Sequence, residues 1–379
     1  MPRNIGQVYD VFDQLSSGLS LQATYRNRIR VFGADSGLSM QFVFANYKSC
    51  PDSTTGLSTI TVAAAVEISG VVTPLTFSGS AEVSIAAGAT ATSDAITITT
   101  PDYIYIRTRP KVSALGNKWP LGFIYGGASF GNEGVTDALD LTLVGSTTVG
   151  VATGYGYGPY QIIANVNQYA SVFVEGDSII YGQGDDGTTG YTAQTYLSDK
   201  GWFSRALNHS RPTKRNAKSG TTASQHATNT YTNAQYGKHT YMLCALGVND
   251  LGDTLANIKS NLSSIYASAK AAGLRVAQTT ISPDGNAGHE TTRTALNAWI
   301  RAKTDTNLDY VIELADAVET ARDSGTWKVG YSDDNLHPNT VGHTAIASAV
   351  GTALMNDIRL ADNILSGGNR VYLGMGIGI

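Results

Sequence analysis

The sequence has few cysteines and few charged residues. These two shortages argue against a disulfide-rich protein and against a nucleic-acid-binding protein. Its 379 residues include two cysteines, Cys50 and Cys244, and 15% charged residues, with a formal net charge of −4. Two cysteines argue against a disulfide framework. We expect Cys50 in a surface loop and Cys244 as a small residue inside a buried strand. The low charge leaves no basic footprint for nucleic acid, so no nucleic-acid partner is predicted.

Long apolar runs and metal-binding motifs are also missing. Since no apolar run of about 18 residues occurs, the sequence predicts no membrane span. The first residues lack the apolar stretch of a signal peptide, so we expect either that the chain is not exported by that route or that the sequence is a processed or recombinant form. Neither His-Glu-x-x-His nor Cys-x-x-Cys occurs, so we predict no metal and no cofactor. The 41 glycines favour an extracellular or virion-associated protein, although the localisation itself stays unknown.

The length of the chain and the pattern of apolar and polar residues along it predict two domains. The chain exceeds the roughly 250–300 residues at which a single core usually stops growing. Residues 1–160 are expected to form an antiparallel β-sandwich or jelly roll, because short runs alternate apolar and polar residues at period two. These predicted strands are 28–32, 39–44, 59–68, 82–85 and 95–99.

Aromatic and glycine residues alternate near the end of this first domain. Trp119 is followed by Tyr125-Gly126-Gly127, and a Tyr/Gly-rich run occupies 154–160. Such rings are able to stack on the apolar faces of sugars, or they cover the junction between two domains. Both interpretations stay open from the sequence.

Residues 161–362 change to alternating strands and helices, which predicts a parallel sheet with right-handed crossovers. The predicted strands are 171–174, 213–218, 241–246, 274–281 and 310–314, and the predicted helices are 192–207, 258–272, 289–303, 340–355 and one beginning near Thr222. The last segment, 363–379, alternates apolar residues with glycine. It is expected to return as a strand to the β domain, with pairing between subunits of a homo-oligomer or a frayed tail as alternatives.

Ser178 is the residue around which the second domain is organised. It follows an apolar strand in the turn Gly176-Asp177-Ser178. A serine nucleophile needs a base, and the base needs an orienting group. Asp334 and His337 lie three residues apart in a loop closed by Pro338 and meet that need. Gly220 and Asn249 each follow a further strand, so their N–H groups are candidate oxyanion donors at the same sheet edge.

The blocks 176–179, 247–250 and 334–338 resemble those of the SGNH hydrolases, also called the GDSL esterase and lipase family. The segment 73–79 is similar to the N-terminal β domain of some two-domain members. The resemblance implies a flavodoxin-like three-layer α/β/α domain. It also implies Ser178 as nucleophile, His337 as general base and acid, and Asp334 as its orienter. The implied oxyanion donors are the backbones of Ser178 and Gly220 and the side chain of Asn249, although the family's second glycine near Gly220 is missing.

Other polar residues in these blocks have simpler roles. Asp177 is expected to fix the turn through local hydrogen bonds, and Asp250 to cap the following helix. Asp185 and Asp186 are predicted on the surface, with a place in the cleft as the alternative. His343 is expected to pack at the start of the last helix. Ordinary surface roles are predicted for the remaining histidines, namely His209, His226, His239 and His289.

The sequence therefore predicts a carboxylic ester hydrolase that acts through a Ser-His-Asp triad and an acyl-enzyme. The first expectation is removal of O-acetyl groups from carbohydrate, which makes an acylated carbohydrate or a small ester the expected partner. A lipid or small-ester esterase is one alternative. The other is a surface or virion-associated glycan-binding module in which the hydrolase domain is secondary. No residue of the sequence identifies the substrate-binding surface.

Overall fold

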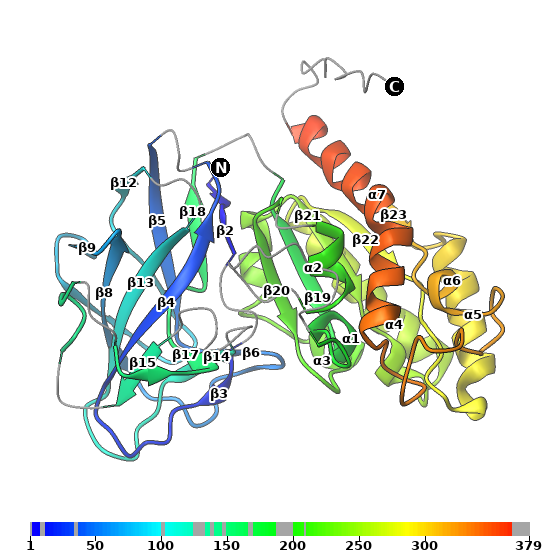
Figure 1. The fold of residues 1–379 in the computed structure, drawn as a ribbon, viewed down its shortest axis with the longest axis horizontal. Coiled ribbons are helices and arrows are strands. Elements are labelled where there is room, and N and C mark those ends of the chain that lie inside the picture. The colour runs from blue at the N-terminus through cyan, green and yellow to red at the C-terminus, as the bar shows by residue number, and fades with distance from the viewer. Residues whose placement is uncertain are drawn as a thin grey trace.

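The computed structural model describes residues 2–7, 12–33, 37–99, 103–123, 133–136, 140–145, 149–165, 170–186, 200–207 and 210–365. These residues form a β lobe and an α/β lobe, which lie side by side along the long axis of the molecule (Figure 1). The order agrees with the predicted one, an antiparallel part followed by a parallel α/β part. Among the described helices, none has both the length and the apolar character needed to cross a membrane.

Two antiparallel sheets enclose the core of the β lobe. One contains β10 (Glu82–Ile85), β8 (Ile60–Ile68), β13 (Tyr103–Lys111) and β4 (Ala23–Val31), and the other contains β1 (Arg3–Asn4), β18 (Gln161–Ala164), β5 (Leu38–Ala45), β11 (Thr90–Thr92) and β12 (Ile96–Ile98). Inward side chains of both sheets, including Ile29, Phe42 and Ile104, are buried in one cluster. This packing follows from the alternation of apolar and polar residues along each strand.

Short strands complete the β lobe. They are β3 (Phe12–Leu15), β6 (Lys48–Ser49), β7 (Asp52–Ser53), β9 (Val71–Pro74), β14 (Pro120–Phe123), β15 (Glu133–Thr136), β16 (Val151–Ala152) and β17 (Tyr155–Gly156). The strands predicted at 28–32, 39–44, 59–68, 82–85 and 95–99 are confirmed as β4, β5, β8, β10 and β12. Strand β13 is absent from those predictions, although it carries the same alternation and pairs with both β4 and β8. The jelly-roll connectivity stays a prediction.

The aromatic residues near the end of the β lobe are mostly part of its core. Trp119, Tyr157 and Tyr160 are almost fully buried, and the Tyr157 hydroxyl donates to the carbonyl oxygen of Ala45. Buried rings offer no face to a sugar, so these three favour a role in covering the junction. Residues 125–127 lie outside the described part of the chain.

The α/β lobe is built on five parallel strands in the order β20, β19, β21, β22, β23. Their bounds are β19 (Val172–Gly176), β20 (Thr213–Ala217), β21 (Tyr241–Ala245), β22 (Arg275–Thr279) and β23 (Tyr310–Ile312). Numbered by their place in this lobe, the strands run 2-1-3-4-5, which is the flavodoxin-like order. Nearly every residue of the three central strands is buried, as expected for a parallel sheet covered on both faces.

Helices cover this sheet. They are α1 (Ser178–Tyr181), α2 (Trp202–Leu207), α3 (Ala223–Ala227), α4 (Leu255–Ala271), α5 (Glu290–Arg301), α6 (Ala315–Val318) and α7 (Thr340–Leu365), with 3₁₀ turns η3 (Asn233–Lys238), η4 (Val248–Asp250) and η5 (Ala287–His289). Helices α2 and α7 pack together, and α3 packs on α4. Of the helix predicted at 192–207, residues 192–199 lie outside the described part of the chain.

Helix α7 is longer than predicted. It continues past residue 355 to Leu365, because Leu354, Ile358 and Ala361 recur at helical spacing and are fully buried. The prediction of a strand from residue 363 is therefore wrong for 363–365, which belong to the helix. The rest of that prediction, 366–379, lies outside the described residues.

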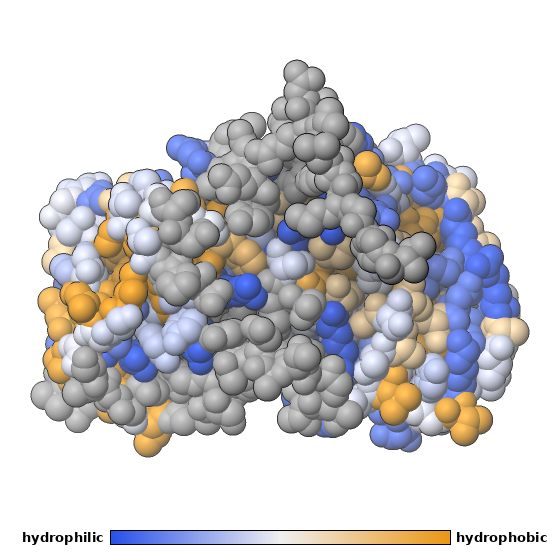
Figure 2. Space-filling model, turned by 45° about the horizontal axis from the view of Figure 1, so that its top comes forward, coloured by the Kyte–Doolittle hydropathy of each residue, from blue (hydrophilic) through white to orange (hydrophobic). Residues whose placement is uncertain are grey.

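The two lobes share one continuous sheet. Strand β2 (Gly6–Gln7) pairs antiparallel with β4 of the β lobe and parallel with β20 of the α/β lobe. Strand β18 pairs with β1 and β5 in the β lobe, so the predicted boundary at residue 161 falls one strand before the first parallel strand. Apolar residues gather on the β lobe at the left of Figure 2, whereas hydrophilic residues cover much of the α/β lobe at the right.

Candidate active site

Ser178 lies in a tight turn at the carboxyl end of β19. Asp177 precedes helix α1 in an extended conformation, and its carboxylate accepts a hydrogen bond of 2.9 Å from the backbone N–H of Ile179. This bond confirms the expected local role of Asp177. Gly176 is required for the turn, because a Cβ at this position would lie 2.6 Å from the side chain of Ile180. The turn presents Ser178 as the first residue of α1.

Ser178, His337 and Asp334 form a continuous chain of hydrogen bonds. The Oγ atom of Ser178 lies 2.9 Å from Nε2 of His337, and Nδ1 of His337 lies 2.7 Å from Oδ2 of Asp334. The Ser178 and His337 residues are 3% and 9% exposed, whereas the Asp334 side chain is 54% exposed. If Nδ1 carries the proton that Asp334 accepts, Nε2 is left as an acceptor for the Ser178 hydroxyl.

The loop before α7 is shaped by Asp334 itself. Its Oδ1 atom accepts from the backbone N–H groups of Leu336 and His337 at 2.9 and 2.7 Å. Asn335, which follows Asp334, has a positive φ of 62°, which asparagine tolerates better than most residues. Burial opposes ionisation of Asp334, but these bonds and the His337 ring lower its pKa to about 2. Asp334 is therefore a carboxylate at neutral pH.

Gly220 and Asn249 lie beyond the two strands that flank β19. Gly176 is in register with Ala217 of β20 and Ala245 of β21, so the three following loops begin at one sheet edge. Gly220 is exposed in a turn with φ of 77°. The side-chain amide of Asn249 donates 2.9 Å to the carbonyl oxygen of Thr221. The structure thus joins the two loops that carry these residues.

Asp250 has a different partner from the predicted one. Its two carboxylate oxygens accept from the backbone N–H of Ala223 at 3.1 and 2.9 Å. Asp250 therefore binds the first turn of α3, which precedes it in the chain, and does not cap the following helix α4. The N-cap of α4 is Thr254. This pairing gives a second connection between the 220 and 249 loops.

A small cleft, with room for about one water molecule, lies at the carboxyl ends of β21 to β23 next to the turn that carries Ser178. Its lining residues are Asp177, Ile179, Ala245, Val248, Thr279, Thr280, Ile281, Ser282 and Leu314. Burial raises the pKa of Asp177 to about 7, against the lowering by its bond from Ile179 N–H and by His226.

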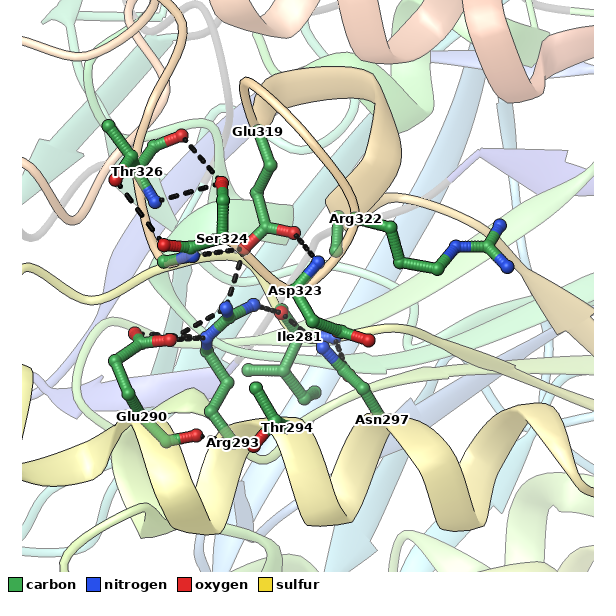
Figure 3. Close-up of polar contacts among 12 residues, drawn as sticks. Ile281, Glu290, Arg293, Thr294, Asn297, Glu319, Arg322, Asp323, Ser324 and Thr326 are labelled. Carbon is green, nitrogen blue, oxygen red and sulfur yellow. Dashed lines mark hydrogen bonds and ion pairs between the residues drawn. The ribbon is translucent and has the colours of Figure 1, made fainter.

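Side chains of helix α5 hold Ile281, which lines this cleft, and Figure 3 shows their polar contacts. The fully buried Arg293 donates 3.1 Å to the carbonyl oxygen of Ile281, and its guanidinium is 2.6 Å from the buried carboxylate of Glu319. Asn297 both accepts from the Ile281 N–H and donates to its carbonyl oxygen. Ile281 is therefore held by two buried side chains of one helix.

Two histidines and one acidic residue lie where the sequence did not predict them. His226 and His239 are buried, at 0% and 5% exposed, so the prediction of surface roles is wrong for both. Asp185 is also buried and pairs with Arg205 at 2.7 Å, whereas Asp186 is exposed as predicted. His209 lies outside the described residues. Each of these buried side chains contacts a segment that is distant from it in the sequence.

Two further predictions concern His343 and the cysteines. His343 is fully buried in the first turn of α7, where its Nδ1 accepts from the backbone N–H of Trp202, and this confirms its packing role. Cys244 is confirmed as a core residue, but Cys50 is 1% exposed, so the prediction of a surface loop is wrong. Cys50 is buried because the hairpin that carries it docks on the α/β lobe. Within the described residues, no group of three His, Cys, Asp or Glu is arranged to hold a metal ion.

None of the curated proteins matches this chain. Among solved structures, a GDSL-like lipase from Bacteroides thetaiotaomicron is 16% identical, with 50% of this chain and 90% of that chain covered and a TM-score of 0.39. An esterase from Pseudoalteromonas sp. is 18% identical, with 50% and 98% covered and a TM-score of 0.38. An acetyl xylan esterase from Geobacillus stearothermophilus is 15% identical, with 51% and 97% covered and a TM-score of 0.38.

A family model also matches part of the chain. The model of the GDSL-like Lipase/Acylhydrolase family matches residues 174–345. This segment begins within β19 and ends in α7, so it includes Ser178, Gly220, Asn249, Asp334 and His337. The match does not extend to the β lobe.

Proposed function

Because residues 174–345 form a GDSL-like lipase/acylhydrolase domain, we propose that this protein is a serine esterase that removes short acyl groups through an acyl-enzyme. The observation that carries the proposal is the hydrogen-bonded chain from Ser178 Oγ through His337 to Asp334. A serine, a base and an orienter in this arrangement are what nucleophilic attack on a carbonyl requires. We propose Ser178 as nucleophile, His337 as general base and acid, and Asp334 as its orienter.

In the first half of the reaction, His337 Nε2 takes the Ser178 proton while Oγ bonds to the ester carbonyl carbon. The tetrahedral oxyanion is held by the N–H groups of Ser178 and Gly220 and by the amide of Asn249. The same proton passes from His337 to the leaving alcohol as the carbon–oxygen bond breaks. Asp334 stabilises the imidazolium that forms between these two steps.

In the second half, a water molecule replaces the alcohol. His337 takes a proton from the water as its oxygen attacks the acyl carbon, and then returns the proton to Ser178 Oγ. The acid leaves, and the free enzyme is restored with no net change in any residue. The carboxylate of Asp334 is present throughout, since its pKa is about 2.

Acetyl esters of carbohydrate are the first substrates we propose. The cleft next to the turn of Ser178 has room for only about one water molecule, and Thr279, Thr280 and Ser282 give part of its lining polar character. A narrow, partly polar cleft suits a short acyl group better than a long alkyl chain. A lipid or small-ester esterase is the alternative within the same chemistry.

A glycan-binding module with a secondary hydrolase domain is the other candidate. The β lobe would then carry the principal function, yet the junction aromatics Trp119, Tyr157 and Tyr160 are buried. This burial removes three of the rings that could stack on a sugar, while Tyr155 of the same run is 37% exposed. We therefore place it second.

The test measures hydrolysis of p-nitrophenyl acetate, butyrate and octanoate beside release of acetate from acetylated xylan and bacterial polysaccharides. Ser178→Ala serves as the blank. Acetate release that needs Ser178 and falls steeply with acyl length supports the proposal. A preference for octanoate favours the lipid esterase, and glycan binding by both proteins without turnover of any ester favours the binding module.

A further inference from the structure

The hairpin of β6 and β7 belongs to the β lobe and contacts the α/β lobe. Asp52 accepts hydrogen bonds from the N–H and the hydroxyl of Thr232, and its own N–H donates 2.9 Å to Oδ1 of Asn229. Tyr47, just before the hairpin, stacks on Tyr231 with ring centroids 5.2 Å apart. The hairpin is therefore anchored to the segment that follows α3.

Cys50, at the tip of this hairpin, contacts a buried histidine of the α/β lobe. Its Sγ atom lies 3.2 Å from Nε2 of His226, which belongs to α3. Nδ1 of His226 lies 2.5 Å from Oε2 of Glu175, and both residues are 0% exposed. Glu175 also accepts from Tyr236 Oη at 2.6 Å and from Asn216 Nδ2 at 2.7 Å. Both of its oxygens thus have donors, as a buried carboxylate requires.

The charge of His226 fits this arrangement. Burial alone would lower its pKa, but Cys50 and Glu175 beside the ring raise it well above the usual value. An imidazolium donates from both nitrogens. One N–H then faces Glu175, and the other, on Nε2, lies between Cys50 Sγ and Thr221 Oγ1, each 3.2 Å from that nitrogen. The Thr221 hydroxyl in turn donates 2.8 Å to the carbonyl oxygen of Lys218.

Thr221 connects this cluster to both candidate oxyanion loops. It directly follows Gly220, and its carbonyl oxygen accepts from the amide of Asn249. A line of contacts therefore runs from Cys50 through His226 and Thr221 to Asn249.

We propose that His226 is a positioning residue for the oxyanion hole. Held by Glu175 and Cys50, it fixes Thr221, and thereby the N–H of Gly220 and the amide of Asn249. The β lobe then takes part in catalysis through its hairpin and is more than an attached module. This inference rests on the proposed esterase function, because the donors matter only if Ser178 attacks an ester.

Two substitutions of His226 separate its two hydrogen bonds. The amide nitrogen of Asn reaches about as far as Nδ1, whereas that of Gln reaches about as far as Nε2. His226→Gln retains the contact with Thr221 and is expected to keep most of the wild-type kcat on p-nitrophenyl acetate. His226→Asn retains only the contact with Glu175. We expect its kcat to fall on the order of 10- to 100-fold with little change in KM, as for a small misplacement of catalytic groups.

His239 is a matched control. It is a second buried histidine that bridges the lobes, since Nε2 lies 2.9 Å from Gln161 of β18 and Nδ1 lies 2.9 Å from Ser171 Oγ. Ser171 precedes β19, so this bridge is at the opposite end of the strand from Ser178. His239→Asn is expected to lower Tm while the folded protein keeps its kcat. Equal losses of kcat in the His226 and His239 variants would overturn the proposal.

A second readout does not depend on turnover. Hydrogen–deuterium exchange is followed in backbone amides of 217–223 and 247–251, and we expect faster exchange in His226→Asn than in wild type or His239→Asn. Unchanged exchange contradicts the positioning role even if the esterase is active. If wild type hydrolyses p-nitrophenyl acetate no faster than Ser178→Ala, the proposed function is wrong, while the exchange rates still test the role of His226.

Thr221→Val is the variant to use if His226→Asn does not fold, because it removes the same contact with little change in volume. A Thr221→Val protein with wild-type kcat and wild-type exchange overturns the proposal.

Discussion

The side-chain amide of Asn249 donates to the carbonyl oxygen of Thr221 at 2.9 Å, so the loop after β20 orients the loop after β21. This bond uses one of the two N–H groups of the planar amide. The plane of the amide is therefore set before any substrate arrives. Preorganised donors of this kind act on the charge that develops in the transition state.

Asn249→Ala removes this donor. We expect kcat on p-nitrophenyl acetate to fall by an amount equivalent to about 2.7–4 kcal/mol of transition-state stabilisation. Asn257→Ala is the control, because the exposed Asn257 of α4 also donates a side-chain hydrogen bond, to Asp253. It should leave kcat unchanged. A folded Asn249→Ala enzyme with wild-type kcat would remove Asn249 from the oxyanion hole.

Asp334→Asn tests the orienting role of the carboxylate. Asn cannot accept the Nδ1–H bond and the two backbone bonds as a charged group does, so the His337 tautomer that leaves Nε2 as an acceptor loses its support. We expect kcat to fall roughly 10²- to 10⁴-fold. Asp333→Asn makes the same change of charge one residue away, on a carboxylate that binds Asn339. Similar activities of the two variants would argue against the role of Asp334.

Asp177→Asn tests the pH dependence of stability. Burial raises the pKa of Asp177 from 3.8 to about 7 in the folded protein. Between these values the folded state binds a proton that the unfolded state has lost, so this group makes stability fall as pH rises from about 4 to about 7. The slope has an upper limit of about 1.4 kcal/mol per pH unit.

The Asn variant keeps an oxygen for the Ile179 N–H and does not titrate. Free energies of unfolding from urea titrations at several pH values between 4 and 7 are compared for the two proteins. We expect the stability of Asp177→Asn relative to wild type to increase across this range. A constant difference between the two would show that Asp177 does not titrate as stated.

The sequence predicted the features that depend on local pattern. The strands of the β lobe follow from alternation at period two, and the parallel sheet follows from strands separated by helices. The order of the nucleophile, asparagine and histidine blocks indicated the family. Ser178, His337 and Asp334 come together as expected, while their catalytic roles stay predictions. The Gly-Asp-Ser turn could be predicted because it needs a glycine, and the structure shows why: a larger residue at Gly176 would collide with Ile180.

Features that depend on distant packing were not predicted. Cys50 and His226 are 176 residues apart in sequence, and the contact between them makes both buried. No periodic pattern around either residue signals that contact. Glu175 offered the only local hint, since it is a charged residue inside the otherwise apolar strand β19. A carboxylate in such a strand needs buried donors, which would have pointed to a histidine or tyrosine.

Arg293→Met tests the support behind the cleft. Arg293 is fully buried between Glu290 and Glu319, and its loss leaves Glu319 as a buried carboxylate without a cation (Figure 3). We expect a loss of about 3–5 kcal/mol in the free energy of unfolding, because removal of one partner of a buried ion pair leaves an uncompensated charge. The double variant Arg293→Met/Glu319→Gln removes that charge and should recover much of the loss. Arg322→Met, at an exposed pair with Asp316, should leave the free energy of unfolding nearly unchanged, because exposed ion pairs contribute little. Urea unfolding of the four proteins measures these differences, and an Arg293→Met variant as stable as Arg322→Met would contradict the role of Arg293.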